Sequence, residues 1–293
     1  MSDLSIQEIV PGVHAVLGGI CNRGLISHGG SVLVVDSGIG VAEATPLRAA
    51  AQESHKDGDG ALYLFNTHPH SDHVYGNQVF ADCPIISHEG VRNFLVAYGE
   101  GALARWRQNP ATAALVSDVV LTPPTLTFQD KMTVFIGDIE VQLLYLGIAH
   151  SPSDSVAWLP QSRTLFAGDL LFNAQVPVWN HGAAGIPPGG SVANWIKALE
   201  KLEALDVAHA IPGHGPIQSA EALADLRRWF ISLHTQVEEA LASGWDRETT
   251  VTRVGQQLQQ QKEQKLAPRG EEERLPNVIG QAFDELSLPS GRQ

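Results

Sequence analysis

The sequence predicts an α/β fold with mixed sheets, and three observations support this prediction. Short apolar runs that end in turn residues alternate with helical stretches from about residue 31 to residue 211. Gly137-Asp138 separates two apolar runs and is a strong signal for a hairpin of antiparallel strands. From Ala220 onward only helical patterns occur. Such alternation favours helices packed on sheets, and the last segment predicts a C-terminal helical extension.

Each element of the first 120 residues is predicted from an apolar run or a helical period. In order, these elements are a strand at Ser31–Asp36, a helix at Val41–His55, a strand at Ala61–Asn66, a strand at Pro84–Ser87, a helix at Glu89–Tyr98, and a helical stretch at 102–120 that Asn109-Pro110 interrupts.

The remaining elements follow from the same patterns. In order, they are strands at Met132–Ile136, Ile139–Leu146, Ser155–Leu159 and Thr164–Ala167, an amphipathic helix at Val192–Leu205, a strand at Ala208–Ile211 and a long helix at Ala220–Ser243. Gly255–Arg274 is rich in Gln, Glu and Lys and predicts a solvated helix with a loop; an interaction surface or part of a lid is the alternative. We therefore expect a domain at 1–218 and an extension at 219–293.

Composition and charge narrow the class of partner. The 293 residues are 43% hydrophobic and 17% charged, as in ordinary globular proteins. The 19 basic and 32 acidic residues give a net charge of −13, which disfavours nucleic acid as a partner because binding to its backbone needs clustered Lys and Arg.

No apolar run approaches a membrane span of about 18 residues, and no secretory leader is visible, so we expect no membrane association and a cytoplasmic location. The oligomeric state stays unknown.

The strongest chemical signal is the pattern His68-x-His70-x-Asp72-His73, directly after a predicted strand. Residues two apart in an extended stretch project to the same side, so His68 and His70 can bind one ion together. Asp72 and His73 follow a turn and can face a second ion. Imidazole and carboxylate ligands suit zinc, and also iron or manganese. The alternative, a polar turn with surface histidines, does not account for this spacing.

Three further candidate ligands each follow an apolar run where a strand should end. They are His150, Asp169 and His214. A glycine lies close to each of them in sequence, which would let the backbone approach a metal closely. The six-residue motif at 68–73 offers too few ligands for two metal sites, so further ligands from elsewhere in the chain are expected.

From about Val10 to about Ile217 the sequence resembles the metallo-β-lactamase-fold hydrolase superfamily. The most specific part is the motif at 68–73, and the three later candidates match the family's later ligand motifs in order. Asp36 matches the aspartate that follows the family's early strand. The resemblance implies an αββα sandwich of two mixed β-sheets flanked by helices, with the metals at one edge between the sheets. Ser153 departs from the family, where many relatives have glycine, but no ligand is lost.

The resemblance also implies a division of labour among the ligands. The first metal would be held by His68, His70 and His150; the second by Asp72, His73 and His214; and Asp169 would bridge them. Asp36 would lie behind the ligands and fix a histidine tautomer or the loop itself.

The implied chemistry is that of a hydrolase with two divalent metal ions, most simply Zn²⁺, with Fe or Mn possible. A metal-bridging hydroxide would attack the carbonyl of a small-molecule ester, thioester, lactone or amide, and Asp72 would orient the hydroxide and carry its proton.

Several other functions remain open from the sequence. An aspartate as the bridging ligand, here Asp169, resembles the glyoxalase II, lactonase and phosphodiesterase branches of the superfamily. Authentic zinc β-lactamases usually have another residue at this position. β-Lactam hydrolysis as a main or side activity, a mononuclear iron sulfur dioxygenase and a non-catalytic metal-binding module are the alternatives. The Gly/Pro-rich loop from about Phe172 to Gly190 suggests that Trp179 and His181 line a substrate pocket.

Overall fold

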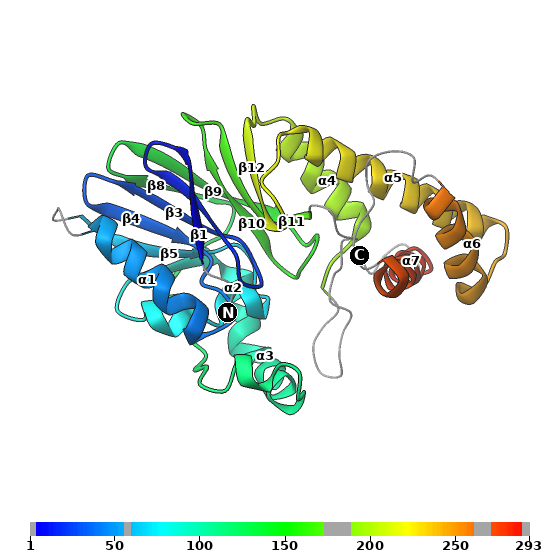
Figure 1. Cartoon of the computed structure of the whole chain (residues 1–293). Coiled ribbons are helices and arrows are strands. Elements are labelled where there is room, and N and C mark those ends of the chain that lie inside the picture. The colour runs from blue at the N-terminus through cyan, green and yellow to red at the C-terminus, as the bar shows by residue number, and fades with distance from the viewer. Residues whose placement is uncertain (1–3, 56–59, 173–188, 261–270, 289–293) are drawn as a thin grey trace.

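Two mixed β-sheets face each other, and helices cover their outer faces (Figure 1). The computed structural model describes residues 4–55, 60–172, 189–260 and 271–288. The expected α/β sandwich of the αββα type is therefore confirmed.

The first sheet contains seven strands in sequence order. They are β1 (Ser5–Val10), β2 (Val13–Leu17), β3 (Arg23–His28), β4 (Ser31–Val35), β5 (Leu62–Asn66), β6 (Ile85–His88) and β7 (Leu126–Phe128). Neighbours from β1 to β4 are antiparallel, whereas those from β4 to β7 are parallel. Parallel neighbours need crossover connections. These contain α1 (Val41–His55), the short helices α2 (Ser71–Val74) and η1 (Asn77–Phe80), α3 (Glu89–Gln108) and η2 (Ala113–Leu115).

The second sheet has the order β12-β11-β10-β9-β8. Its strands are β8 (Lys131–Ile136), β9 (Ile139–Gly147), β10 (Asp154–Leu159), β11 (Thr164–Phe172) and β12 (His209–His214). Only the pair β11–β12 is parallel, and α4 (Val192–Glu203) lies between these two strands in the chain. The hairpin expected at Gly137-Asp138 joins β8 to β9.

Three apolar layers hold the sandwich together. Leu33, Phe65 and Phe166 belong to the layer between the two sheets. A second layer packs α1 on the outer face of the first sheet, with Leu47 among its members. The third packs α4 and the C-terminal helices on the outer face of the second sheet, around Trp195. Strands buried on both faces explain why the runs at β4, β10 and β11 read as continuously apolar.

The N-terminal strands β1–β3 are the main addition to the expected fold, because we assigned no element before Ser31. Each is only five or six residues long, and turns at Pro11-Gly12 and Gly18-Gly19 separate them, so no long period is visible. A correction concerns α3, which continues through Gly99 and Gly101 to Gln108 rather than ending near Tyr98. A side chain at position 99 would meet Leu121 at 2.9 Å, so glycine there allows close packing.

The C-terminal segment forms three helices, α5 (Glu221–Ala242), α6 (Arg247–Gln260) and α7 (Glu271–Leu286) (Figure 1). Phe230, Val254 and Val278 from these helices share the apolar layer of α4. The segment Gly255–Arg274, which we predicted to be a solvated helix with a loop, is described only in part, and there Leu258 also belongs to this apolar layer. The boundary near residue 218 stays a prediction. No helix within the described ranges is long and apolar enough to cross a membrane.

Candidate metal centre

The seven predicted ligands come from five segments that meet where strands of both sheets end. In chain order, the segments are the loop after β5 (His68, His70), α2 (Asp72, His73), the β9–β10 loop (His150), β11 (Asp169) and the last residue of β12 (His214). The fold thus gathers residues up to 146 positions apart (His68 to His214) into one cluster.

One group of potential ligands comprises His68, His70, His150 and Asp169, whose ligand atoms lie within 4.8 Å of one another. The His150 Nε2 and His70 Nδ1 atoms are 2.7 Å apart. The Asp169 Oδ2 atom lies 3.2 Å from His150 Nε2 and 3.7 Å from His68 Nε2. Three ring nitrogens and one carboxylate so close together match the ligand types of a zinc-like cation.

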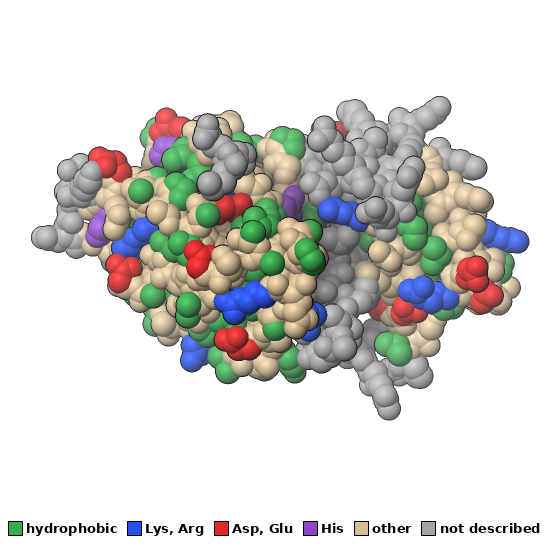
Figure 2. Space-filling model, turned by 60° about the horizontal axis from the view of Figure 1, so that its bottom comes forward, with side chains coloured by type: hydrophobic (Ala, Val, Ile, Leu, Met, Phe, Trp, Pro, Cys, Tyr) green, Lys and Arg blue, Asp and Glu red, His purple; other side chains and the backbone are tan. Residues whose placement is uncertain are grey.

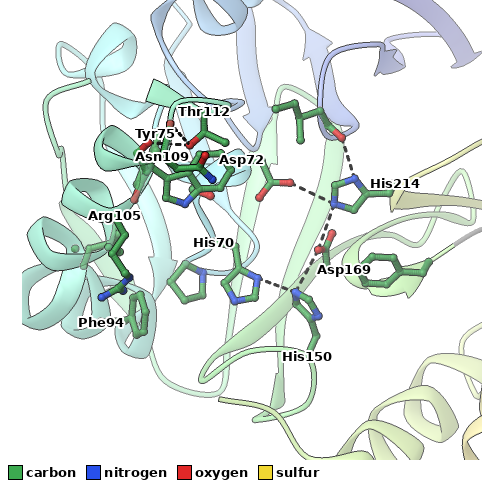
Figure 3. A pocket seen from close by; sticks show the side chains of 18 of the residues that line it. His70, Asp72, Tyr75, Phe94, Arg105, Asn109, Thr112, His150, Asp169 and His214 are labelled. Carbon is green, nitrogen blue, oxygen red and sulfur yellow. Dashed lines mark hydrogen bonds and ion pairs between the residues drawn. The ribbon is translucent and has the colours of Figure 1, made fainter. Parts of the chain in front are cut away.

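A second group comprises Asp72, His73 and His214. The Asp72 Oδ2 atom is 3.3 Å from His214 Nε2 and 3.6 Å from His73 Nε2. Asp169 also reaches this group: its Oδ1 lies 3.2 Å from His73 Nε2, and its Oδ2 lies 3.4 Å from His214 Nε2. Asp169 therefore lies between the groups, in the position that a bridging ligand would need (Figure 3).

Hydrogen bonds at the far ring nitrogen orient three of the histidines. The Nδ1 atom of His73 is 2.8 Å from Asp36 Oδ2, and that of His214 is 2.8 Å from the Ile20 carbonyl oxygen. The Nδ1 atom of His68 is 3.0 Å from Thr67 Oγ1. Since these partners accept the Nδ1 proton, each Nε2 is directed into the cluster, where it can bind a cation once any proton that it carries has left. This is the usual way in which a protein sets the tautomer of a metal-binding histidine.

Asp36 lies behind the ligand loop. Besides His73, it accepts hydrogen bonds at 2.8 Å from both the backbone N–H and the hydroxyl of Thr67. Its own φ of 60° is unusual for a residue other than glycine. Asp36 thus contacts both a candidate ligand and the loop. Sequence reasoning missed Thr67, because it is adjacent to the motif but has no spacing signal of its own.

The chemistry of the cluster fits divalent cations. Among the described residues, ten buried side-chain atoms have no hydrogen-bond partner, and five of them belong to cluster residues: His68 Nε2, His70 Nε2, His73 Nε2, His150 Nδ1 and Asp169 Oδ1. Buried polar groups without partners are rare in folded proteins because each costs free energy. A bound cation would satisfy three of these five atoms, His68 Nε2, His73 Nε2 and Asp169 Oδ1, which face other candidate ligands.

The charge states of the cluster also favour a cation. Burial lowers the pKa of His70 to about 3, and His150 adds to this effect, so His70 is neutral at physiological pH. Burial opposes ionisation of Asp169, but His214 and the other imidazoles hold its pKa well below the ordinary value. Burial likewise opposes protonation of His214, yet Asp169 and Asp72 raise its pKa to about 10. The carboxylates thus attract positive charge, which a metal ion can supply in place of a proton.

A cavity of about 870 Å³ opens onto the cluster (Figure 3). His70, Asp72, His150, Asp169 and His214 line one part of it, so a small molecule in the cavity can reach both ligand groups. Six of its other lining residues come from α3, and the sequence did not point to these. Trp179 and His181, which we expected to line the pocket, lie outside the described residues.

A family comparison agrees with these features. Residues 16–214 match the model of the metallo-beta-lactamase superfamily. Among curated proteins, the type 2 metallo-beta-lactamase of Bacteroides fragilis is 30% identical over 117 residues, which are 39% of this chain and 45% of that protein. The alpha subunit of the 2,4-dinitroanisole O-demethylase of Nocardioides sp. strain JS1661 is 27% identical over 202 residues, 68% of this chain and 54% of that protein. The chain spans about half the length of these relatives.

Solved structures show the same fold. A metallo-beta-lactamase from Pontibacter korlensis superposes with a TM-score of 0.58 at 19% identity and covers 78% of this chain and 99% of its own. A stereoselective inverting sec-alkylsulfatase from Pseudomonas sp. superposes with a TM-score of 0.68 at 16% identity. That match covers 99% of this chain and 51% of the alkylsulfatase. The likeness to the second structure therefore includes the C-terminal helices.

Proposed function

The chain belongs to the metallo-beta-lactamase superfamily, and on that premise we propose that it is a hydrolase that uses two divalent metal ions, most simply Zn²⁺. The observation that carries the proposal is the position of Asp169, whose two oxygens approach imidazoles of both ligand groups. Two neighbouring cations need a shared anionic ligand, and the contacts of Asp169 with both groups support this role for its carboxylate. When bound, such ions would lower the pKa of water and polarise a carbonyl oxygen.

The chain's own residues would hold and orient the reactants. His68, His70 and His150 form one set of ligands, and Asp72, His73 and His214 form the other. Burial opposes ionisation of Asp72, but His73 and His214 lower its pKa to about 2, so its carboxylate is ionised. Both of its close imidazole contacts use Oδ2. The Oδ1 atom is therefore available to accept a proton from a water molecule in the cavity.

The substrate class we propose is a small ester, thioester, lactone or amide. The cavity has room for a small molecule and its wall is largely apolar. On the face drawn in Figure 2, acidic and basic side chains are interspersed. A nucleic-acid substrate would favour a basic surface, so the net charge of −13 also supports a small molecule.

Metal analysis and a substrate panel test this proposal. Protein supplied with Zn²⁺ and then freed of loosely bound metal should retain two ions per chain by elemental analysis. His70→Ala should lose metal and hydrolysis, whereas His234→Ala, on α5 and paired with Glu238, should keep both. The panel should contain a phenyl ester, a thioester, a lactone, a β-lactam, a phosphodiester, an aryl methyl ether and a secondary alkyl sulfate.

Each alternative has its own result in this experiment. Retention of no transition metal would refute the proposal. One iron per chain with oxygen consumption would favour a sulfur dioxygenase. Two metals without turnover of any panel member would favour a non-catalytic module. Turnover of the β-lactam alone would assign the chain to the β-lactamases.

A further inference from the structure

One wall of the cavity is a single face of α3. The residues of α3 that line it are Phe94, Leu95, Gly99, Ala102, Arg105 and Trp106. Leu95, Gly99, Ala102 and Trp106 follow spacings of four, three and four residues, which places them on one stripe of the helix. Most are apolar or small. This wall therefore suits the apolar part of a ligand that reaches the metal ligands at the other side.

The charges on the cavity wall have one sign once the predicted metal ligands are set aside. Among the described lining residues, the charged side chains outside the ligand set are Arg105 of α3 and Arg274 of α7. This is opposite to the chain as a whole, in which acidic residues outnumber basic ones by 32 to 19. Burial raises the pKa of Tyr75, another lining residue, so its phenol stays neutral and adds no negative charge. The wall thus favours an anionic ligand over a cationic one.

Arg105 differs from the other arginines of α3 in what its guanidinium contacts. Arg92 donates to the Pro124 carbonyl oxygen, and Arg107 donates to the carbonyl oxygens of Val116 and Val119. Arg105 is half-buried, and its guanidinium has no hydrogen bond or ion pair with any residue in the described part of the chain. Figure 3 shows it across the cavity from His150, Asp169 and His214.

From this geometry we propose that Arg105 forms an anion-binding subsite and that the substrate carries a carboxylate, sulfate or phosphate group remote from the bond that is cleaved. The inference rests on the proposed hydrolase function and names its substrate class. A guanidinium binds such groups through two parallel charge-assisted hydrogen bonds, which are stronger in a half-buried site than in water. The apolar stripe of α3 would contact the part of the substrate that links the anion to the reacting carbonyl.

A matched pair of esters tests the subsite by kinetics. Mono-p-nitrophenyl adipate and p-nitrophenyl hexanoate share a six-carbon acyl chain, and only the first ends in a carboxylate. Arg105→Gln should lower kcat/KM for the adipate by about tenfold or more, mainly through a higher KM, because a hydrogen bond to a charged group is lost. Turnover of the hexanoate should change by less than about twofold. Arg105→Lys should recover part of the loss. Arg228→Gln, which removes an exposed arginine of α5 paired with Asp225, should change neither ester.

Calorimetric binding to the metal-loaded protein separates this proposal from the hydrolase proposal. The probes are 5-phenoxypentanoate and 5-phenoxypentanol, which contain no bond for the proposed hydrolysis to cleave. The acid should bind more tightly than the alcohol, and Arg105→Gln should remove that preference. If the wild-type protein hydrolyses neither ester, the hydrolase proposal fails, while the binding data still decide on the subsite. If Arg105→Gln leaves the preference unchanged, the carboxylate binds elsewhere, for example at the metals, and the subsite proposal is overturned.

Discussion

At the residue scale, Asp36 makes the most connections behind the candidate metal centre. Its carboxylate accepts from His73 Nδ1 and from two groups of Thr67, while the Thr67 hydroxyl in turn accepts from His68. One aspartate therefore orients a candidate ligand in each of the two groups. Removing it should disturb both groups without removing any ligand.

We predict that Asp36→Asn lowers zinc affinity by about 10- to 100-fold, the range typical when a partner of a ligand histidine is lost. An amide cannot accept from His73 and Thr67 as the carboxylate does, so the imidazole loses its fixed tautomer. Competition with a chelator of known affinity measures the change. Asp82→Asn, which removes an exposed carboxylate paired with Arg48, is the matched control and should keep full affinity. Equal affinities for both variants would show that Asp36 does not tune the site.

The pH dependence of metal affinity follows from His214. Without metal, the nearby carboxylates raise its pKa to about 10, against an ordinary value of 6.5. At any lower pH a metal ion must displace this proton, so zinc affinity should rise with pH between 6 and 9, by about tenfold per unit for each proton released. Chelator competition at several pH values, with the chelator's own protonation taken into account, checks the slope. An affinity independent of pH across this range would contradict the charge state we assign to His214.

At the element scale, the site depends on how closely β12 passes β11. A Cβ atom at Gly213 would lie 1.9 Å from Asp169 Oδ1, so no side chain fits between the strand and the central carboxylate. The parallel register of the two strands also shifts on either side of Gly168, where the chain reaches Asp169. Glycine at 213 is therefore needed for the position of Asp169 rather than for a turn.

We predict that Gly213→Ala displaces Asp169 and removes most of the bound metal, because the carboxylate cannot stay between both ligand groups. Elemental analysis and thermal unfolding of the same preparation measure the two effects. Gly101→Ala is the control: a Cβ there meets nothing within 4 Å, and alanine should stabilise α3 by about 0.5–1 kcal/mol. Full metal occupancy in Gly213→Ala would mean that β12 can move away from Asp169.

At the scale of the whole molecule, the C-terminal helices support the metal centre through aromatic rings in contact with one another. The Phe230 ring of α5 lies 4.7 Å from that of Trp195 in α4, and the Trp195 ring lies 5.3 Å from the imidazole of His150. Phe230 and Trp195 are fully buried. The last helices are thus part of the same apolar layer as the strands that carry the ligands.

Phe230→Ala should lower the free energy of unfolding by about 3–5 kcal/mol, the cost of a large cavity in a core. Urea denaturation, followed both by circular dichroism and by release of metal, measures it. Ile231→Ala, at the exposed neighbouring position, should cost much less. Coincident transitions by the two probes would show that the C-terminal helices and the sandwich that carries the candidate ligands unfold together. Separate transitions would instead support independent units divided near residue 218.

Much of the fold and of the candidate site was predictable because its signals are local. Strands buried on both faces give continuous apolar runs, and the His-x-His-x-Asp-His motif places four candidate ligands within one loop and one helical turn. The later candidates could be named because each follows an apolar run, although in the structure Asp169 lies within β11 and His214 is the last residue of β12. The α/β class and the family resemblance therefore needed no coordinates. The short strands β1–β3 give weaker patterns, and only their pairing in the first sheet makes them visible.

Only the tertiary structure decided which groups meet. That Asp169 lies between the two groups, that Thr67 joins Asp36 to His68, and that Arg105 faces the cavity all depend on segments far apart in the sequence. Sequence patterns report the period and burial of a segment, whereas contacts between distant segments depend on how the sheets and helices pack. The sequence by itself determined the chemistry available to this protein, and the packing of its layers decided where that chemistry converges.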